Sequence, residues 1–158
     1  MKATKLFLIL IISFSIFNAA CKRDEATICE NLLEQGIADS TSIKGEWEFK
    51  YFAKTINGNK ISKKEPISDQ HWIGFNGSNI NGGICNTLGG KYSLNSSNNI
   101  SISVNSITFK LCDTETNELE STLIKSLNNA ICFVVKGNEL LIHYKEIDKR
   151  NVLVLTKK

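Results

Sequence analysis

The sequence has 158 residues, with 19 lysines and arginines against 16 aspartates and glutamates. Two of the lysines lie in an N-terminal segment that we expect to be removed, which leaves 17 basic residues (19 − 2) against 16 acidic ones. A balance so close to neutral argues against nucleic acid or an anionic membrane face as the partner, because both require a concentrated basic surface. The 114 residues that follow residue 44 suit one domain with one core.

The first 20 residues have the organisation of a signal peptide. Residues 6–17 are uncharged and apolar apart from two serines, but twelve residues are too few to cross a bilayer, since a spanning helix takes roughly 20. Two alanines follow as small cleavage-site residues, and then comes Cys21. The segment resembles a lipobox, although Asn18 stands where an aliphatic residue is usual. We therefore expect export and acylation of Cys21. An ordinary signal peptide followed by an incidental cysteine is the alternative.

Residues 21–44 are polar and poorly patterned, and we expect them to form a lipidated tether ahead of a domain at residues 45–158. Lys22–Glu25 resembles the basic-then-acidic signal that sends some bacterial lipoproteins to the cell surface. A solvated tether is the other reading of these four residues. The expected location is the outer membrane, at its periplasmic face or at the cell surface.

Past residue 44 the apolar pattern takes the two-residue period of β-strands. Trp47, Phe49 and Tyr51 alternate with charged residues, and the Asn-Gly pair at 57–58 favours a two-residue hairpin. Lys60–Gln70 is charged and holds the only proline, so we expect a loop there. Further strands are predicted at residues 71–75, 80–85, 90–94, 100–104 and 107–111.

One helix is predicted in the mature chain. Leu119, Leu123 and Leu127 fall four residues apart with polar residues between them. The N-cap candidates are Asp113, Thr114 and Thr116. Strands are predicted after the helix at residues 131–135, 140–144 and 152–155. This order predicts a β-rich α+β fold, in which one helix covers a curled antiparallel sheet of short strands.

Four cysteines remain beyond Cys21, and an even number in an exported protein indicates disulfides. The four are Cys29, Cys85, Cys112 and Cys132. They allow three pairings, between which spacing alone does not choose. None lies in a Cys-x-x-Cys pair or at ligand spacing from a histidine, so we expect no metal site.

A glycine-rich motif spans residues 80–92. Gly82 and Gly83 let the backbone turn tightly or approach another strand closely. Asn86 is suited to bond within its own turn, and Gly90 lets the chain re-enter the sheet. These properties favour a structural corner, with a ligand site as the alternative.

The motif also resembles the Gly-x-x-Cys-Asn-x-x-x-Gly-x-Tyr element of META-domain (HslJ-like) proteins. Thr108–Cys112 resembles the second element of that family, Asn117–Leu119 the start of its helix, and Gly137–Ile142 its closing hairpin. The match covers roughly half of the chain, and Ile84 departs from it because many relatives have glycine there. The resemblance implies a cracked half-barrel, like that of secretin pilot lipoproteins.

The resemblance further implies that Cys85 and Cys112 face each other and form a disulfide. Cys29 and Cys132 are the two cysteines that then remain, and a bond between them would tie the tether to the domain. The family is associated with heat shock, envelope stress and drug tolerance, so the resemblance implies a binding or chaperone-like role.

Patterns typical of catalysis are missing from the sequence. The run Gly89–Lys91 fails as a phosphate-binding loop, because Cys85 stands where the motif has a glycine and Tyr92 where it has a serine or threonine. There is no Gly-x-Ser-x-Gly motif, and cysteines that are expected to be oxidised are poor nucleophiles. His71 and His143 are interpreted as surface or sheet residues. We expect neither an enzyme nor a cofactor.

Three hypotheses follow. The first is a monomeric, non-enzymatic envelope lipoprotein that binds a protein or a small apolar ligand. The second is a lipocalin-like carrier, because Gly45-Glu46-Trp47 resembles the Gly-x-Trp of the first lipocalin strand. The early helix and the short chain argue against an eight-stranded closed barrel. The third is an inhibitor of foreign enzymes that acts through an exposed loop such as Lys60–Gln70.

Overall fold

The computed structural model describes residue 29 and residues 41–56, 60–67, 71–95, 98–146 and 149–158. The expected signal peptide, Cys21, most of the tether and the turn at 57–58 lie outside the described residues. The described strands are β1 (Gly45–Ile56), β2 (Lys60–Pro66), β3 (Trp72–Asn76), β4 (Asn79–Gly83), β5 (Thr87–Asn95), β6 (Asn99–Ile107), β7 (Ala130–Lys136), β8 (Glu139–Glu146) and β9 (Lys149–Lys157), with helix α2 (Thr114–Asn128) between β6 and β7.

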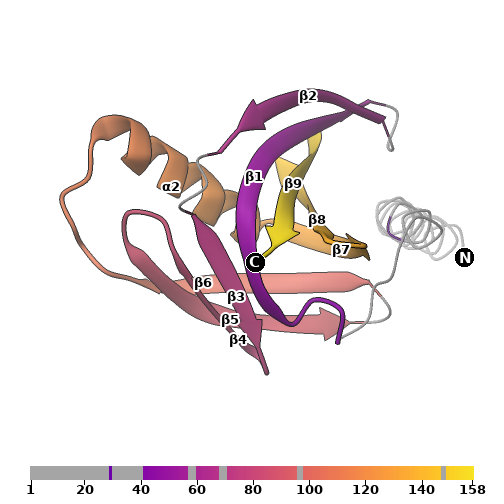
Figure 1. The fold of residues 1–158 in the computed structure, drawn as a ribbon, viewed down its shortest axis with the longest axis horizontal. Coiled ribbons are helices and arrows are strands. Elements are labelled where there is room, and N and C mark those ends of the chain that lie inside the picture. The colour runs from indigo at the N-terminus through magenta and orange to yellow at the C-terminus, as the bar shows by residue number, and fades with distance from the viewer. Residues whose placement is uncertain (1–28, 30–40, 57–59, 68–70, 96–97, 147–148) are drawn as a thin grey trace, which may run out of the picture.

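Eight of these strands form a closed antiparallel barrel, seen from one side in Figure 1. The pairings run β1-β3-β4-β5-β6-β7-β8-β9 and return from β9 to β1. Strand β1 makes this closure possible because it is long. One of its edges pairs with β9 over most of its length, while its other edge pairs first with β3 and then with β2. Irregular register in four of the pairings, one of them within β1–β9, supplies bends that a closing sheet needs.

The expected cracked half-barrel is therefore wrong. The closure depends on pairing between residues about a hundred positions apart, such as Phe49 with Leu155, and local patterns do not reveal it. The charged segment from Lys60 is also a strand for most of its length rather than a loop, because it pairs with β1 as an addition outside the circuit. Residues 108–113, in contrast, have no regular structure, so the strand expected at 107–111 is wrong beyond Ile107.

Helix α2 lies at the seam between β6 and β7, which pair only at Asn99 and Cys132 among the described residues. Its C-terminal end is joined to β6 by a bond from the Val104 amide to the Asn128 side chain, with an N–O distance of 2.8 Å. Asp113 is the N-cap, as the sequence predicted, and accepts a bond from the Thr116 amide. Among the described residues, no helix is long and apolar enough to cross a membrane.

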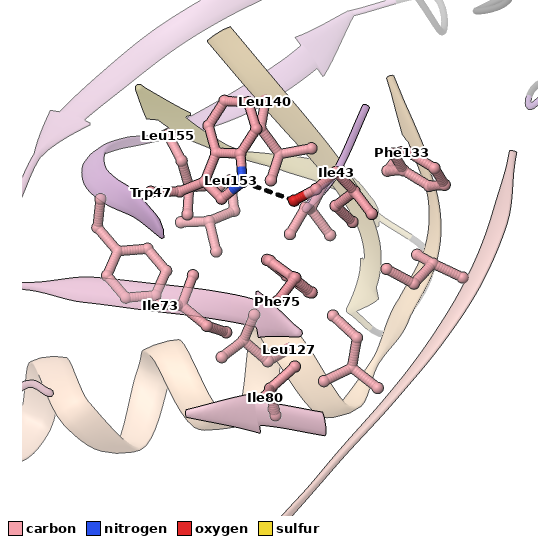
Figure 2. Packing of buried hydrophobic residues seen from close by; sticks show 14 of the residues in the cluster. Ile43, Trp47, Ile73, Phe75, Ile80, Leu127, Phe133, Leu140, Leu153 and Leu155 are labelled. Atoms are coloured by element: carbon pink, nitrogen blue, oxygen red, sulfur yellow. Dashed lines mark hydrogen bonds between the residues drawn. The ribbon is translucent and has the colours of Figure 1, made fainter. Parts of the chain in front are cut away.

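The barrel interior is filled by side chains from the strands and from the helix (Figure 2). Trp47 is 1% exposed, and its indole nitrogen donates to the carbonyl oxygen of Ile43 over 2.8 Å. Ile43 is fully buried in the same cluster, so the core begins two residues before the expected domain start. Leu123 and Leu127 of α2 are fully buried there as well. The leucine spacing therefore identified the helical face that packs into the barrel.

Candidate binding surface

Three large apolar side chains are exposed where the chain leaves β6. Phe109 and Leu111 have the exposure of free side chains, at 101% and 106%, and Ile107 is 37% exposed. Every second residue of this segment is apolar, and we call Ile107, Phe109 and Leu111 the apolar strip. A fully exposed phenylalanine beside a fully exposed leucine is unusual, because burying either would stabilise a protein by roughly 1.5–3 kcal/mol.

The intervening residues of the strip segment are held by Asn86. The Asn86 side-chain oxygen accepts bonds from the Lys110 amide, at 2.7 Å, and from the Thr108 hydroxyl, at 3.3 Å. The Thr108 hydroxyl oxygen in turn accepts from the Thr87 amide at 3.0 Å. Instead of bonding within its own turn, the Asn86 side chain thus bonds across to the segment that carries the strip. This fixes a segment that has no helix or strand of its own.

Asn86 is itself fixed from the other side by Glu120 of α2. The Asn86 amide donates to one carboxylate oxygen at 2.9 Å, and its side-chain nitrogen donates to the other at 2.8 Å. Asn86 and Glu120 are 5% and 8% exposed. A buried carboxylate needs such donors, because leaving it without them is strongly unfavourable. We call Asn86, Thr108, Lys110 and Glu120 the Asn86 clasp.

A disulfide between Cys85 and Cys112 lies next to the clasp, with 6.2 Å between the two Cα atoms. It ties the β4–β5 corner to the end of the strip segment. Asn117 of α2 also donates to the Cys112 carbonyl oxygen at 3.2 Å. The strip is thus held by β6 at one end and by a covalent bond at the other. The exposed side chains of the strip therefore lie on a segment whose backbone is held in place at both ends.

The charges around the strip are mainly negative. Asp113 is exposed, and its bonds from the backbone and hydroxyl of Thr116 lower the pKa of its carboxyl. Glu115 and Glu118 are exposed on the first turns of α2. Burial lowers the pKa of His71, and the carboxylate of Glu120 opposes that effect to a smaller extent. The carboxylate of Glu120 is thus buried in the clasp, while those of Asp113, Glu115 and Glu118 are exposed on the surface beside it.

An open depression lies beside the first residue of the strip. It is lined by Ile107 and by one side of α2, which includes Ser121, Ile124 and Asn128. The sides of the depression are mixed polar and apolar. It is open to solvent and adjoins the strip at Ile107.

The glycines of the motif allow close approach between strands. A Cβ atom on Gly82 would lie 2.6 Å from the Trp72 carbonyl oxygen, and one on Gly90 would overlap the carbonyl of Ser103. A Cβ on Gly83 would lie 3.1 Å from the Trp72 indole nitrogen. Gly82 and Gly83 lie inside β4 and Gly90 lies inside β5, and none of the three has a positive φ. These glycines therefore allow close approach between strands, and they do not form the turn itself.

The structure pairs Cys29 with Cys132, with a Cα–Cα distance of 5.9 Å, in addition to Cys85 with Cys112. The family resemblance implied the Cys85–Cys112 bond, and the Cys29–Cys132 bond was expected between the two cysteines that remained. His71 and His143 are buried, at 7% and 4% exposure. His143 lies in β8, which agrees with its interpretation as a sheet residue, and His71 directly precedes β3. Among the described residues, no group of three histidine, cysteine or acidic side chains is placed to hold a metal ion.

Sequence reasoning missed two parts of this surface. Glu120 was not among the predicted site residues, although its position one residue after Leu119 puts it at the edge of the buried helical face. Residues 107–111 were predicted to form a strand, whereas only Ile107, which pairs with Leu88 of β5, belongs to one. Phe109 and Leu111 are exposed because the chain leaves the sheet after Ile107, which the alternation of apolar residues does not reveal.

Comparison with solved structures supports the fold. A DUF4847 family protein from Bacteroides vulgatus aligns with a TM-score of 0.54 at 19% identity, over 74% of this chain and 94% of that chain. A protein from Burkholderia xenovorans aligns with a TM-score of 0.53 at 14% identity, over 75% and 84%. No curated protein sequence matches with significance. The META domain family matches residues 40–158, a range that contains both strip and clasp. The chain therefore belongs to the META domain family.

Proposed function

We propose that the protein is a non-enzymatic lipoprotein of the bacterial envelope that is held to the outer membrane through Cys21 and binds a partner through the apolar strip. The observation that carries the binding role is the complete exposure of Phe109 and Leu111 on a segment fixed by the Asn86 clasp and the Cys85–Cys112 bond. An ordered apolar surface lowers the entropy lost on binding. The family resemblance supports a role in envelope stress, in which such a surface acts in binding or as a chaperone.

The test is complementation of a strain that lacks the gene, challenged with heat or detergent. The double variant Phe109→Ser/Leu111→Ser should fail to restore tolerance, although it accumulates to the wild-type amount. Cys21→Ala should fail as well, because it removes the acylation site. Ser101→Ala, an exposed position on β6, is the matched control and should complement fully. Full complementation by the double variant would show that the function does not depend on the strip.

The second candidate is a carrier of a small apolar ligand. The closed eight-stranded barrel favours it, since barrels of this size hold either packed side chains or one small ligand. The short chain and the position of the helix, which argued against such a barrel, do not prevent closure. The interior nevertheless contains large buried residues, among them Trp47, Phe49 and Phe133. Native mass spectrometry of protein from its own cells tests this candidate, because a carrier retains its ligand.

A further inference from the structure

The strip and the anchoring end of the domain lie at opposite ends of β6. Cys132 pairs with Asn99, the first residue of β6, and is bonded to Cys29. The strip begins at Ile107, the last residue of β6. Eight steps along a strand (107 − 99) cover about 26 Å. In Figure 1 the segment that follows β6 accordingly extends away from the end at which β6 begins.

The Cys29–Cys132 bond also shortens the connection to the membrane, if Cys21 is acylated as proposed. Without the bond, 22 residues (43 − 21) separate Cys21 from Ile43, where the core begins, and they span up to about 75 Å. With the bond, only eight residues (29 − 21) separate the acylated residue from the barrel, and they span at most about 28 Å. The Asn99 end of β6 is therefore kept near the bilayer.

Charge argues against the bilayer as the surface that covers the strip. Between residues 105 and 121 the only basic residue is Lys110. The acidic residues of the same range are Asp113, Glu115, Glu118 and Glu120, and the first three are exposed. Anionic lipid headgroups repel such carboxylates, whereas lysine and arginine side chains attract them. Lys125 lines the depression beside Ile107, but its ammonium pairs with Glu146 at 3.4 Å, so the charge beside the strip is negative on balance.

We infer that the strip docks into an apolar groove bordered by lysines or arginines on a different protein, which approaches from the side of the barrel opposite to the lipid anchor. This inference rests on the proposed function for the anchor and deepens it for the strip. Phe109 and Leu111 enter the groove, and Glu115 and Glu118 meet its basic border.

The experiment is photo-crosslinking in intact cells, with p-benzoylphenylalanine replacing Phe109 in the full-length protein. Ser101, exposed near the other end of β6, carries the same group in the control. Mass spectrometry identifies the adduct and the partner residues that it joins. The expected result is a protein adduct at position 109 that is absent at position 101 and maps to an apolar groove with basic residues at its border.

Charge reversal then tests the chemistry of the groove. Glu115→Lys/Glu118→Lys should lower the adduct yield by more than about tenfold, since like charges across an interface are strongly unfavourable. Changing the mapped basic residues of the partner to glutamate should restore the yield. Glu139→Lys, an exposed acidic position outside the helix, is the control and should leave the yield unchanged.

A lipid adduct, an adduct with a second copy of this chain, no adduct, or a yield insensitive to charge reversal would each overturn the inference. The mass of the mature N-terminal peptide separately reports acylation of Cys21. If the protein is not acylated but gives the expected charge-sensitive adduct, the lipid anchor of the proposed function is wrong. The inference that the strip docks into an apolar groove with a basic border then still holds.

Discussion

Cys29 and Cys132 are buried, with 3% and 0% of their surfaces exposed, whereas Cys85 and Cys112 lie partly exposed at a corner of the barrel. The first bond closes a loop of 104 residues (132 − 29 + 1) that contains most of the barrel. The second closes 28 residues (112 − 85 + 1) and fixes the segment that carries the apolar strip. One bond therefore acts on the whole fold, while the other also shapes a local surface.

Removal of the buried bond should have the largest effect on stability. Cys29→Ala/Cys132→Ala should lower the free energy of unfolding by about 4.7 kcal/mol, because the unfolded chain regains the entropy of a loop of about 100 residues. Urea denaturation of the non-reduced protein measures this. Below the unfolding transition, hydrogen exchange of the Lys110 amide should stay slow. If the Lys110 amide exchanged fast in this variant while the free energy of unfolding stayed unchanged, the Cys29–Cys132 bond would act locally and not on the whole fold.

Removal of the corner bond should have a smaller global effect and a larger local one. Cys85→Ala/Cys112→Ala should lower the free energy of unfolding by about 3.6 kcal/mol, from the entropy of a 28-residue loop. The Lys110 amide should exchange faster under native conditions, because only hydrogen bonds with Asn86, Thr87 and Asn117 then hold the segment. If this amide stays as protected as in wild type, the clasp does not need the disulfide.

The sequence was informative where a pattern is local. The alternation from Trp47 predicted β1, and the spacing of Leu119, Leu123 and Leu127 predicted both the helix and its buried face. Prediction from the sequence failed where the structure depends on pairing between segments that are far apart in the chain. Closure of the barrel depends on pairing of β1 with β9, and the charged segment from Lys60 is a strand because β1 offers it an edge. The strand predicted at 107–111 ends at Ile107, and the chain leaves the sheet there, so Phe109 and Leu111 stay exposed.

Loss of the buried carboxylate in the clasp should have an intermediate effect. Glu120→Gln removes the charge that accepts both Asn86 bonds and places an amide nitrogen where one acceptor stood. The expected decrease in the free energy of unfolding is about 2 kcal/mol, the usual range for hydrogen bonds to a charged group. Thermal or urea unfolding measures it. Glu118→Gln, exposed two residues earlier, should change stability by less than about 0.5 kcal/mol.

The corner should also respond to acid through His71. Burial lowers the pKa of His71 below its ordinary value of 6.5, with an opposing contribution from Glu120. Between the lowered pKa and 6.5 the unfolded chain binds a proton that the folded chain does not, so stability falls as the pH is lowered through this window. The slope that one such group contributes is at most about 1.4 kcal/mol per pH unit. In His71→Gln this part of the pH dependence should disappear, and an unchanged profile would show that other groups cause it.

The smallest expected effect on stability is at the strip, and it separates surface from core. Phe109→Ser/Leu111→Ser should change the free energy of unfolding by less than about 0.5 kcal/mol, because both side chains are already fully exposed. Phe133→Ala, at a fully buried position, should lower it by about 3–5 kcal/mol. A loss above about 1 kcal/mol in the strip variant would mean that the strip is covered in the isolated protein. Dependence of that loss on protein concentration would then identify a second copy as the cover, and the exposed corner would be an interface between identical chains.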